Sequence, residues 1–194
     1  MKTRPQTGES KTLAPETNTG SLYDHRNDQE RAGILVLGVG NILLSDEGVG
    51  VRAVQRLEEE YVLPPEVEVL DGGTSGLELL GYIEHRERLF LIDAVHKQGL
   101  QPGSTFRKVL QDPPAYFQQK ITPHQLGLSD VLAAAALTES LPEQITLYGI
   151  VPKNLETGLE LSAEAARGVE KILNMILKDL KEVGIEIRKS KQSF

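Results

Sequence analysis

Two acidic residues stand side by side shortly after the first apolar run of the chain. Asp46 and Glu47 follow residues 34–37 and a turn that contains Gly38 and Gly40. Carboxylates can bind divalent cations, and they repel anionic ligands such as a pyrophosphate. Each one alone is equally consistent with an acidic residue at a helix N-terminus, where the helix dipole favours it by about 0.3 to 1 kcal/mol. Their chemistry therefore depends on the partners that the fold brings to them.

Asp93 and His124 are the candidate partners. Asp93 ends a third apolar run at residues 89–92, and His124 follows Pro123 just before a helical pattern. In open α/β sheets, ligands bind beyond the carboxyl ends of the strands, where the direction of winding reverses, so Glu47 and Asp93 are expected to converge. Two carboxylates and one imidazole can hold nickel, zinc or another divalent ion and leave positions open for water or substrate. Taken alone, His124 is more typical of a surface histidine and Asp93 of a turn cap, so the metal-site prediction depends on all three residues.

The glycine turn also allows a different interpretation. Gly38 and Gly40 after a buried strand could begin a dinucleotide-binding turn, with Asp71 at the end of the next strand as the acid that binds a ribose. Leu43 stands where the third glycine of that fingerprint would let the helix approach the strand closely. The two carboxylates that follow have the wrong charge for a pyrophosphate. The sequence therefore disfavours an oxidoreductase, and glycines that simply form a tight turn remain an alternative.

The candidate residues lie at the ends of elements that alternate between short apolar runs and helical patterns. Because this alternation is typical of parallel βαβ units, we predict an α/β fold: a single domain with a twisted, mostly parallel sheet and helices on both faces. Strands are expected at residues 34–37, 67–70, 89–92 and 145–150, with a possible edge strand at 105–110 inside a turn-rich excursion from 95 to 122. Helices are expected at residues 51–61, 77–83 and 128–135, and from an N-cap at Ser162 to Gly184.

Length and composition limit the organisation of the chain. A chain of 194 residues suits one domain, because single cores usually organise about 100 to 200 residues. Residues 1–33 are rich in Thr, Pro, Gly and acidic residues and have no apolar face, so we expect a disordered N-terminal extension. The domain is expected at residues 34–187, followed by a polar C-terminal tail at residues 188–194.

Charge and cysteine usage exclude several classes of function. The formal net charge of -7 and the lack of a basic stripe argue against nucleic acid as a partner. The chain has no cysteine, which excludes disulfides, thiolate metal sites and cysteine nucleophiles. No apolar run reaches the roughly 18 residues of a membrane span, and the N-terminus lacks the apolar core of a secretory signal. We therefore expect no membrane insertion and a cytoplasmic location.

Five segments together resemble the nickel-iron hydrogenase maturation endopeptidases, and most closely the type that matures hydrogenase 2. They are residues 34–50, 71–80, 91–94, 123–132 and 148–152. The combination of Gly-Val-Gly-Asn-Ile-Leu-Leu with Pro-His-Gln-Leu-Gly is specific, whereas each piece alone is not. The resemblance covers almost everything from Ile34 to about Gly184, and these proteases usually lack an N-terminal extension.

The resemblance implies an endopeptidase that acts on the large-subunit precursor of a nickel-iron hydrogenase and removes its C-terminal extension after nickel insertion. It implies that Glu47, Asp93 and His124 form the metal site, with nickel presented by the substrate. Asp46 and Asp71 match further acidic positions, which suggests supporting catalytic roles in orientation or proton transfer. The resemblance leaves the group that activates water unassigned, and a nickel-binding assembly chaperone without hydrolysis remains an alternative. A monomer is sufficient for a substrate that is itself a large folded protein.

Overall fold

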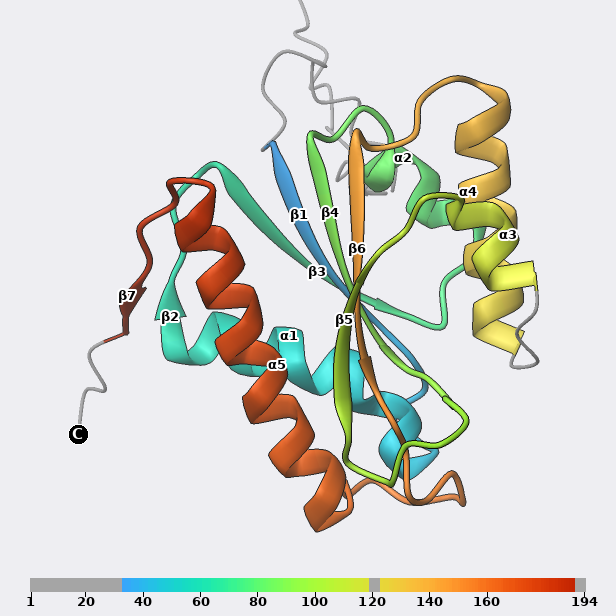
Figure 1. Ribbon diagram of the computed structural model, residues 1–194, viewed down its shortest axis with the longest axis vertical. Coiled ribbons are helices and arrows are strands. Elements are labelled where there is room, and N and C mark those ends of the chain that lie inside the picture. The colour runs from blue at the N-terminus through green and yellow to red at the C-terminus, as the bar shows by residue number, and fades with distance from the viewer. Residues whose placement is uncertain (1–32, 119–122, 191–194) are drawn as a thin grey trace, which may run out of the picture.

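The computed structural model of the chain describes residues 33–118 and 123–190. The extension expected at residues 1–33 lies outside these ranges except for Gly33. The described residues form a central five-stranded sheet, whose order is β3 (Val67–Gly73), β1 (Ile34–Val39), β4 (Arg88–Ala94), β6 (Gln144–Ile150) and β5 (Thr105–Val109). The first four strands in this order are parallel, and β5 pairs antiparallel with β6 at the edge. The sheet is twisted and mostly parallel, as predicted (Figure 1).

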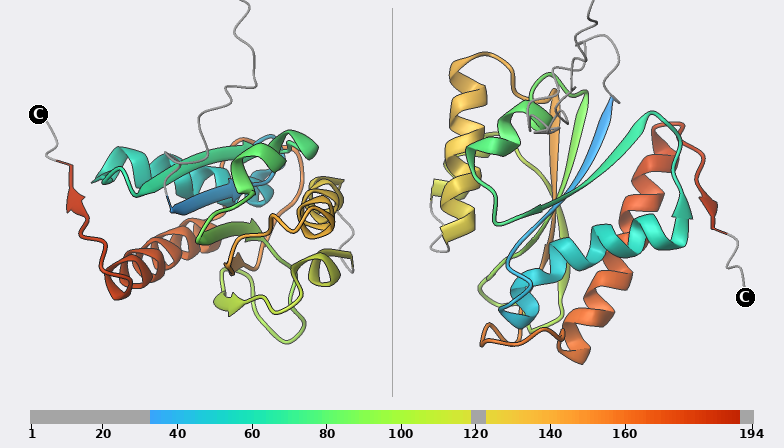
Figure 2. Two further views of the ribbon diagram at one scale, coloured as in Figure 1. Left: turned by 90° about the horizontal axis from the view of Figure 1, so that it is seen from above. Right: turned by 180° about the vertical axis from the view of Figure 1, so that it is seen from behind.

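Helices cover both faces of this sheet. One face carries α1 (Val49–Glu60) and α5 (Ala163–Glu182), and the other carries α2 (Leu80–Ile83), α3 (Pro113–Gln118) and α4 (Pro123–Leu137) (Figure 1, Figure 2). A short 3-10 helix, η2 (Leu77–Leu79), leads into α2. No helix within the described ranges is long and apolar enough to cross a membrane. The arrangement confirms the predicted α/β class with helices on both faces.

The two faces of the sheet enclose separate apolar cores, and alternate residues of β1 contribute to each. Ile34 and Val36 pack into the core beneath α1 and α5, whereas Leu35 belongs to the core beneath α2, α3 and α4. This alternation follows from the two-residue period of a strand. Because both faces are covered, every residue of β1 is buried, which explains why the strand reads as a continuous apolar run.

The last helix follows its predicted pattern closely. The side-chain oxygen of Ser162 accepts a hydrogen bond from the amide of Ala165 at 3.1 Å, which confirms the N-cap. The helix ends at Glu182, and Gly184 follows with a φ of 86°, a value that glycine adopts without strain. The apolar face of this helix is buried against the sheet and α1, as expected for an amphipathic helix.

Away from the candidate site residues, two features of the fold differ from the prediction. Tyr61 was expected to extend the apolar face of the first helix, but that helix ends at Glu60. Tyr61 instead begins β2 (Tyr61–Val62), which pairs antiparallel with β7 (Arg188–Lys189). The prediction was wrong because Tyr61 satisfies its backbone by pairing with a segment near the end of the chain, which helical spacing cannot reveal. β7 also occupies the first residues of the expected polar tail.

The second difference is α3, which was expected to be part of a turn-rich excursion. Two consecutive prolines begin it, and the Oδ1 atom of Asp112 accepts a hydrogen bond from the amide of Ala115 at 3.1 Å. Proline suits the first turn of a helix because its missing N–H would have no helical partner there. An acidic cap followed by proline was therefore a usable helix signal. The side chain of Phe117 is completely buried and anchors α3 on the sheet.

Asp179 joins α5 to the far edge of the sheet. Its Oδ2 atom accepts hydrogen bonds from the hydroxyl of Tyr148 and from Nε of Arg107, each at 2.5 Å. Tyr148 is fully buried on β6, and burial together with the neighbouring Asp179 carboxylate raises the pKa of Tyr148 far above its usual range. The phenol therefore stays protonated and remains a hydrogen-bond donor at any working pH. Arg107 lies on β5, so this contact links α5 to two strands.

We expect Asp179→Ala to lower the free energy of unfolding by about 2 kcal/mol, because the buried Tyr148 hydroxyl loses its acceptor. Chemical denaturation monitored by circular dichroism measures this change. Glu182→Ala is the matched control, because it breaks the exposed pair of Lys178 and Glu182 on the same helix. That control should cost less than about 0.5 kcal/mol. Equal losses in the two variants would show that the buried contact stabilises the fold no more than an exposed ion pair does.

Candidate active site

The sheet changes its direction of winding between β1 and β4. The chain passes from β1 to β3 on one side and then returns to place β4 on the other side. Ligands of open α/β sheets bind at the carboxyl ends of such strands. Glu47 lies in η1 (Ser45–Gly48), the 3-10 helix that follows β1, and Asp93 is the next-to-last residue of β4. The structure therefore brings these two predicted residues to the same edge from adjacent strands.

Two glycines allow η1 and the start of α1 to lie directly against the strands. Gly40 has a φ of 130°, and a Cβ atom placed there would lie 1.9 Å from the carbonyl oxygen of Glu47. A Cβ atom at Gly50 would lie 2.3 Å from the carbonyl oxygens of Val39 and Ile92. Because such contacts are impossible, any side chain at either position would push the helical segment away from β1 and β4. Leu43 occupies the position where the dinucleotide fingerprint needs a glycine for close contact between helix and strand. In this chain, Gly50 further along allows that close contact instead.

Glu47 and Asp93 are both buried, with 6% and 0% of their surfaces exposed, and each has interaction partners. Buried carboxylates are rare unless they are paired, hydrogen-bonded or bound to a metal. Burial raises the pKa of Tyr116 on α3, and the nearby charge of Asp93 raises it further. Tyr116 therefore lies in the same neighbourhood as Asp93. Sequence reasoning missed Tyr116, since its segment shows no clear periodicity and α3 was not expected.

His124 is the second residue of α4, within the first turn of the helix. The prediction of a loop position just before the helix was therefore wrong, and Pro123 occupies the first helical position, which proline favours. A crossover helix runs opposite to its parallel strands, so the start of α4 points toward the carboxyl edge (Figure 1). The side chain of His124 lies outside the described part of the molecule. Among the side chains that are described, no group of three or more His, Asp or Glu residues is arranged to hold a metal ion.

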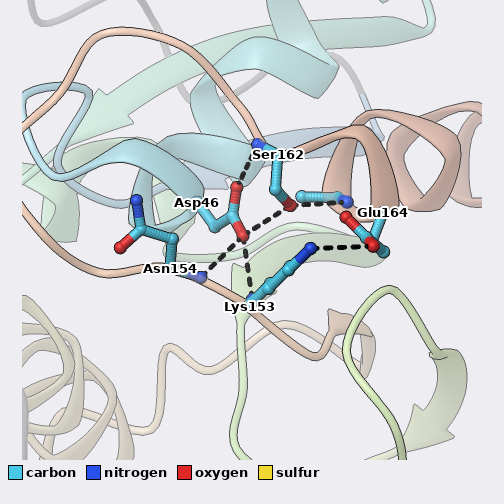
Figure 3. A network of polar contacts seen from close by, with 6 residues as sticks. Asp46, Lys153, Asn154, Ser162 and Glu164 are labelled. Carbon is cyan, nitrogen blue, oxygen red and sulfur yellow. Dashed lines mark hydrogen bonds and ion pairs between the residues drawn. The ribbon is translucent and has the colours of Figure 1, made fainter.

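Asp46 has a different environment from its neighbour Glu47. Its carboxylate accepts hydrogen bonds from the amides of Lys153, Asn154 and Ser162 at 2.8, 3.0 and 2.7 Å, and from the Ser162 hydroxyl at 2.8 Å (Figure 3). These donors belong to the loop between β6 and α5 and to the N-cap of α5. Asp46 therefore fixes that loop against η1, directly beside Glu47.

The pKa of Asp46 is lowered from its ordinary value of 3.8. Burial alone would raise this pKa, but the amide donors of Ser162, Asn154 and Lys153 and the Ser162 hydroxyl outweigh that effect by stabilising the charged form. A carboxyl whose pKa is lower in the folded state stabilises the fold above its unfolded pKa. This contribution is lost as the pH falls through the folded value.

We therefore expect Asp46→Asn to lower the free energy of unfolding at pH 7 by about 2 to 3 kcal/mol, because a neutral amide cannot accept from all these donors. The difference from the parent protein should shrink as the pH falls below the ordinary aspartate value of 3.8. Urea denaturation between neutral pH and the acid limit of folding measures both effects. Asp130→Asn, at an exposed position on α4, is the control and should change little. A difference that does not depend on pH would contradict the charged-acceptor role.

Asp71 lies on β3, next to Gly38 of β1, and its side chain is exposed. Its Oδ1 atom accepts a hydrogen bond from the amide of Gly73 at 3.0 Å, and its Oδ2 atom accepts one from Nε2 of Gln55 at 3.4 Å. β3 continues two residues beyond Asp71, to Gly73, so the strand does not end where the sequence suggested. Asp71 is thus locally hydrogen-bonded on the strand that flanks β1.

Comparison with known proteins identifies the family. The family model for hydrogenase maturation proteases matches residues 51–179. The hydrogenase 2 maturation protease of Escherichia coli K12 is 46% identical over 153 residues, which are 79% of this chain and 93% of that protein. The solved structure of the hydrogenase maturating endopeptidase HybD from E. coli superimposes with a TM-score of 0.78 at 45% identity and covers 82% of this chain and 99% of its own.

A more distant solved structure, the [NiFe] hydrogenase maturation protease HybD of Thermococcus kodakarensis, has a TM-score of 0.62 at 31% identity and covers 75% of this chain and 97% of its own. Both superpositions cover nearly the whole length of the solved protein. The similarity therefore concerns the entire fold and not one motif. The carboxyl edge that holds Glu47 and Asp93 is thus the candidate site of a peptidase. The chain belongs to the hydrogenase maturation protease family.

Proposed function

We propose that this peptidase removes the C-terminal extension of a nickel-iron hydrogenase large-subunit precursor after nickel has been inserted. The observation that carries the proposal is that two buried carboxylates, Glu47 and Asp93, lie at the switch point of a chain from this family. A nickel-iron enzyme as substrate is supported by a solved relative that is named a [NiFe] hydrogenase maturation protease.

Nickel enters this proposal as part of the substrate. Glu47, Asp93 and His124 are the residues that we propose contact it, because carboxylate and imidazole groups suit a borderline divalent ion and the chain has no thiolate. Three such ligands would hold free nickel weakly, and a precursor that already presents the ion would supply the missing coordination. A metal ion at a scissile bond can polarise the carbonyl group or lower the pKa of a bound water.

The other two acidic residues have supporting roles in this scheme. Four donors already surround the carboxylate of Asp46, so we propose that it orients η1 and Glu47. Asp71 is exposed on the strand next to β1, where a side chain can reach a docked precursor. We propose that it orients the precursor or moves a proton.

The decisive experiment incubates the full chain with a nickel-loaded large-subunit precursor and follows the mass of both proteins. The expected result is loss of a C-terminal peptide from the precursor. Tight association without any change in mass would overturn the proposal in favour of a nickel-binding assembly chaperone. The absence of both association and cleavage would also overturn the proposal. The alternative of a dinucleotide-dependent oxidoreductase would then be tested by adding nicotinamide cofactors.

A further inference from the structure

Two aromatic rings and two lysines form a continuous strip next to Asp93, which we call the aromatic–lysine strip: Lys97, Phe106, Lys108 and Tyr116. In the sheet, Asp93 of β4 pairs with Gly149 of β6, which in turn pairs with Phe106 of β5. A Cβ atom at Gly149 would lie only 2.2 Å from Cζ of Phe106. The Phe106 ring therefore lies across the strand that separates it from Asp93.

Each ring of the strip carries one ammonium group. Nζ of Lys97 lies 4.3 Å from the centroid of the Phe106 ring, and Nζ of Lys108 lies 4.5 Å from the centroid of the Tyr116 ring. Both rings pack against the core beneath α2, α3 and α4, whereas both lysines are exposed. An exposed cation–π contact contributes about 0.5 to 1 kcal/mol, which holds the ammonium group in place without neutralising its charge. Its N–H groups remain able to bind an anion.

Ion pairs neutralise two lysines elsewhere in the described residues. Lys153 pairs with Glu164 at 2.9 Å, and Lys178 pairs with Glu182 at 3.7 Å. Neither Lys97 nor Lys108 forms an ion pair with any carboxylate that the structure describes. The strip thus places two such cations beside the candidate active site of a chain whose formal net charge is -7. They fit an anionic partner that arrives from outside the chain.

We propose that the aromatic–lysine strip binds carboxylate groups of the precursor's C-terminal extension and so selects which precursors are cut. This inference rests on the proposed function. An extension at the end of a chain carries a terminal carboxylate, and acidic side chains would add others. Phe106 and Lys108 lie two residues apart on β5, a distance of roughly 7 Å, so the strip follows a strand leading away from Asp93. A peptide whose scissile bond lies near Asp93 can run along it.

The test measures cleavage of nickel-loaded precursor by the full chain carrying Lys97→Glu and Lys108→Glu. The matched control carries Lys171→Glu and Lys178→Glu on α5, which makes the same change in net charge at exposed positions elsewhere. At low salt we expect kcat/KM to fall at least about tenfold in the strip variant alone, with kcat within about twofold, because charges outside the reacting atoms act mainly on encounter and binding. The loss should shrink at about 0.5 M salt, where screening shortens the range of the charges.

Further variants separate charge from structure and this inference from the proposed function. Lys97→Gln with Lys108→Gln removes the charges without reversing them, and we expect a smaller loss in the same direction. A precursor whose extension carries Asn and Gln in place of Asp and Glu keeps only its terminal carboxylate. The parent chain should cut it more slowly, and the difference between the parent and glutamine variants should become smaller than with the acidic precursor. If the strip and control variants cleave the acidic precursor equally at low salt, the strip does not select it, although the proposed function stands. If the parent chain cuts no nickel-loaded precursor, the proposed function fails first and this inference with it.

Discussion

Replacement of His124 by Ala is expected to reduce cleavage of nickel-loaded precursor by at least about a hundredfold, because misplacing a reacting group by about 1 Å already costs that much. We expect the fold to tolerate the change, because the buried apolar residues of α4 that the structure describes lie further along the helix. The free energy of unfolding should therefore stay within about 1 kcal/mol of the parent value. Single-turnover cleavage and urea denaturation measure the two quantities on the same preparation.

The matched control is His85→Asn, which removes another imidazole at an exposed position. His85 has a φ of 59°, and asparagine tolerates this left-handed conformation better than alanine does. Cleavage by this variant should match that of the parent protein. A His124→Ala protein that still trims the precursor at the parental rate would remove His124 from the working site and leave Glu47 and Asp93 as its remaining candidates.

Metal-free precursor is expected to resist cleavage almost completely, even when the protease is in excess. The proposed ligand set has two carboxylates and one imidazole, so nickel seated in the precursor completes the contact between the two proteins. Without it, the precursor loses both affinity and the alignment of its scissile bond, and alignment can account for about 7 to 11 kcal/mol of a barrier. Nickel would in this way act as a checkpoint on the order of assembly.

A side-by-side assay of nickel-loaded and metal-free precursor, read by mass spectrometry, tests the checkpoint. Titration of the protease alone with nickel should show only weak binding, because the precursor supplies the remaining ligands. Adding free nickel to the protease should consequently fail to restore cleavage of a metal-free precursor that cannot take up the ion. Equal cleavage of the two forms would rule out the checkpoint, while a peptidase activity by other chemistry would remain.

The elements that were predicted correctly are those whose own residues determine them. β1 is buried on both faces and α5 has a complete apolar face with a cap at each end, so local sequence contains the whole signal. α3 and β2 depend on distant partners instead. α3 has only six residues and is anchored by Phe117. β2 exists only because β7 pairs with it. Short elements of this kind follow tertiary contacts more than propensity.

The residues of the candidate site also fall into those predictable from local sequence and those that depend on distant partners. The placement of Glu47 and Asp93 at one edge of the sheet was predictable, because each follows or ends an apolar strand and the winding rule assigns such positions to that edge. The hydrogen-bond partners of Asp46 lie 107 to 116 residues further along the chain, so its positioning role required the folded structure. Tyr116 could not be associated with Asp93 before α3 was known.

The two glycines beneath η1 and α1 have a consequence for how mutational scans of this protein should be interpreted. Gly40 and Gly50 determine how near Glu47 comes to β4, yet neither has a side chain that could touch a precursor. In a saturation scan scored by precursor cleavage, both positions should tolerate no substitution and would be indistinguishable from residues that perform the chemistry. A parallel scan scored by protein abundance would separate the two groups, because a displaced η1 also weakens packing. Engineering of new precursor specificity should therefore vary β5 and α3 and leave positions 40 and 50 unchanged.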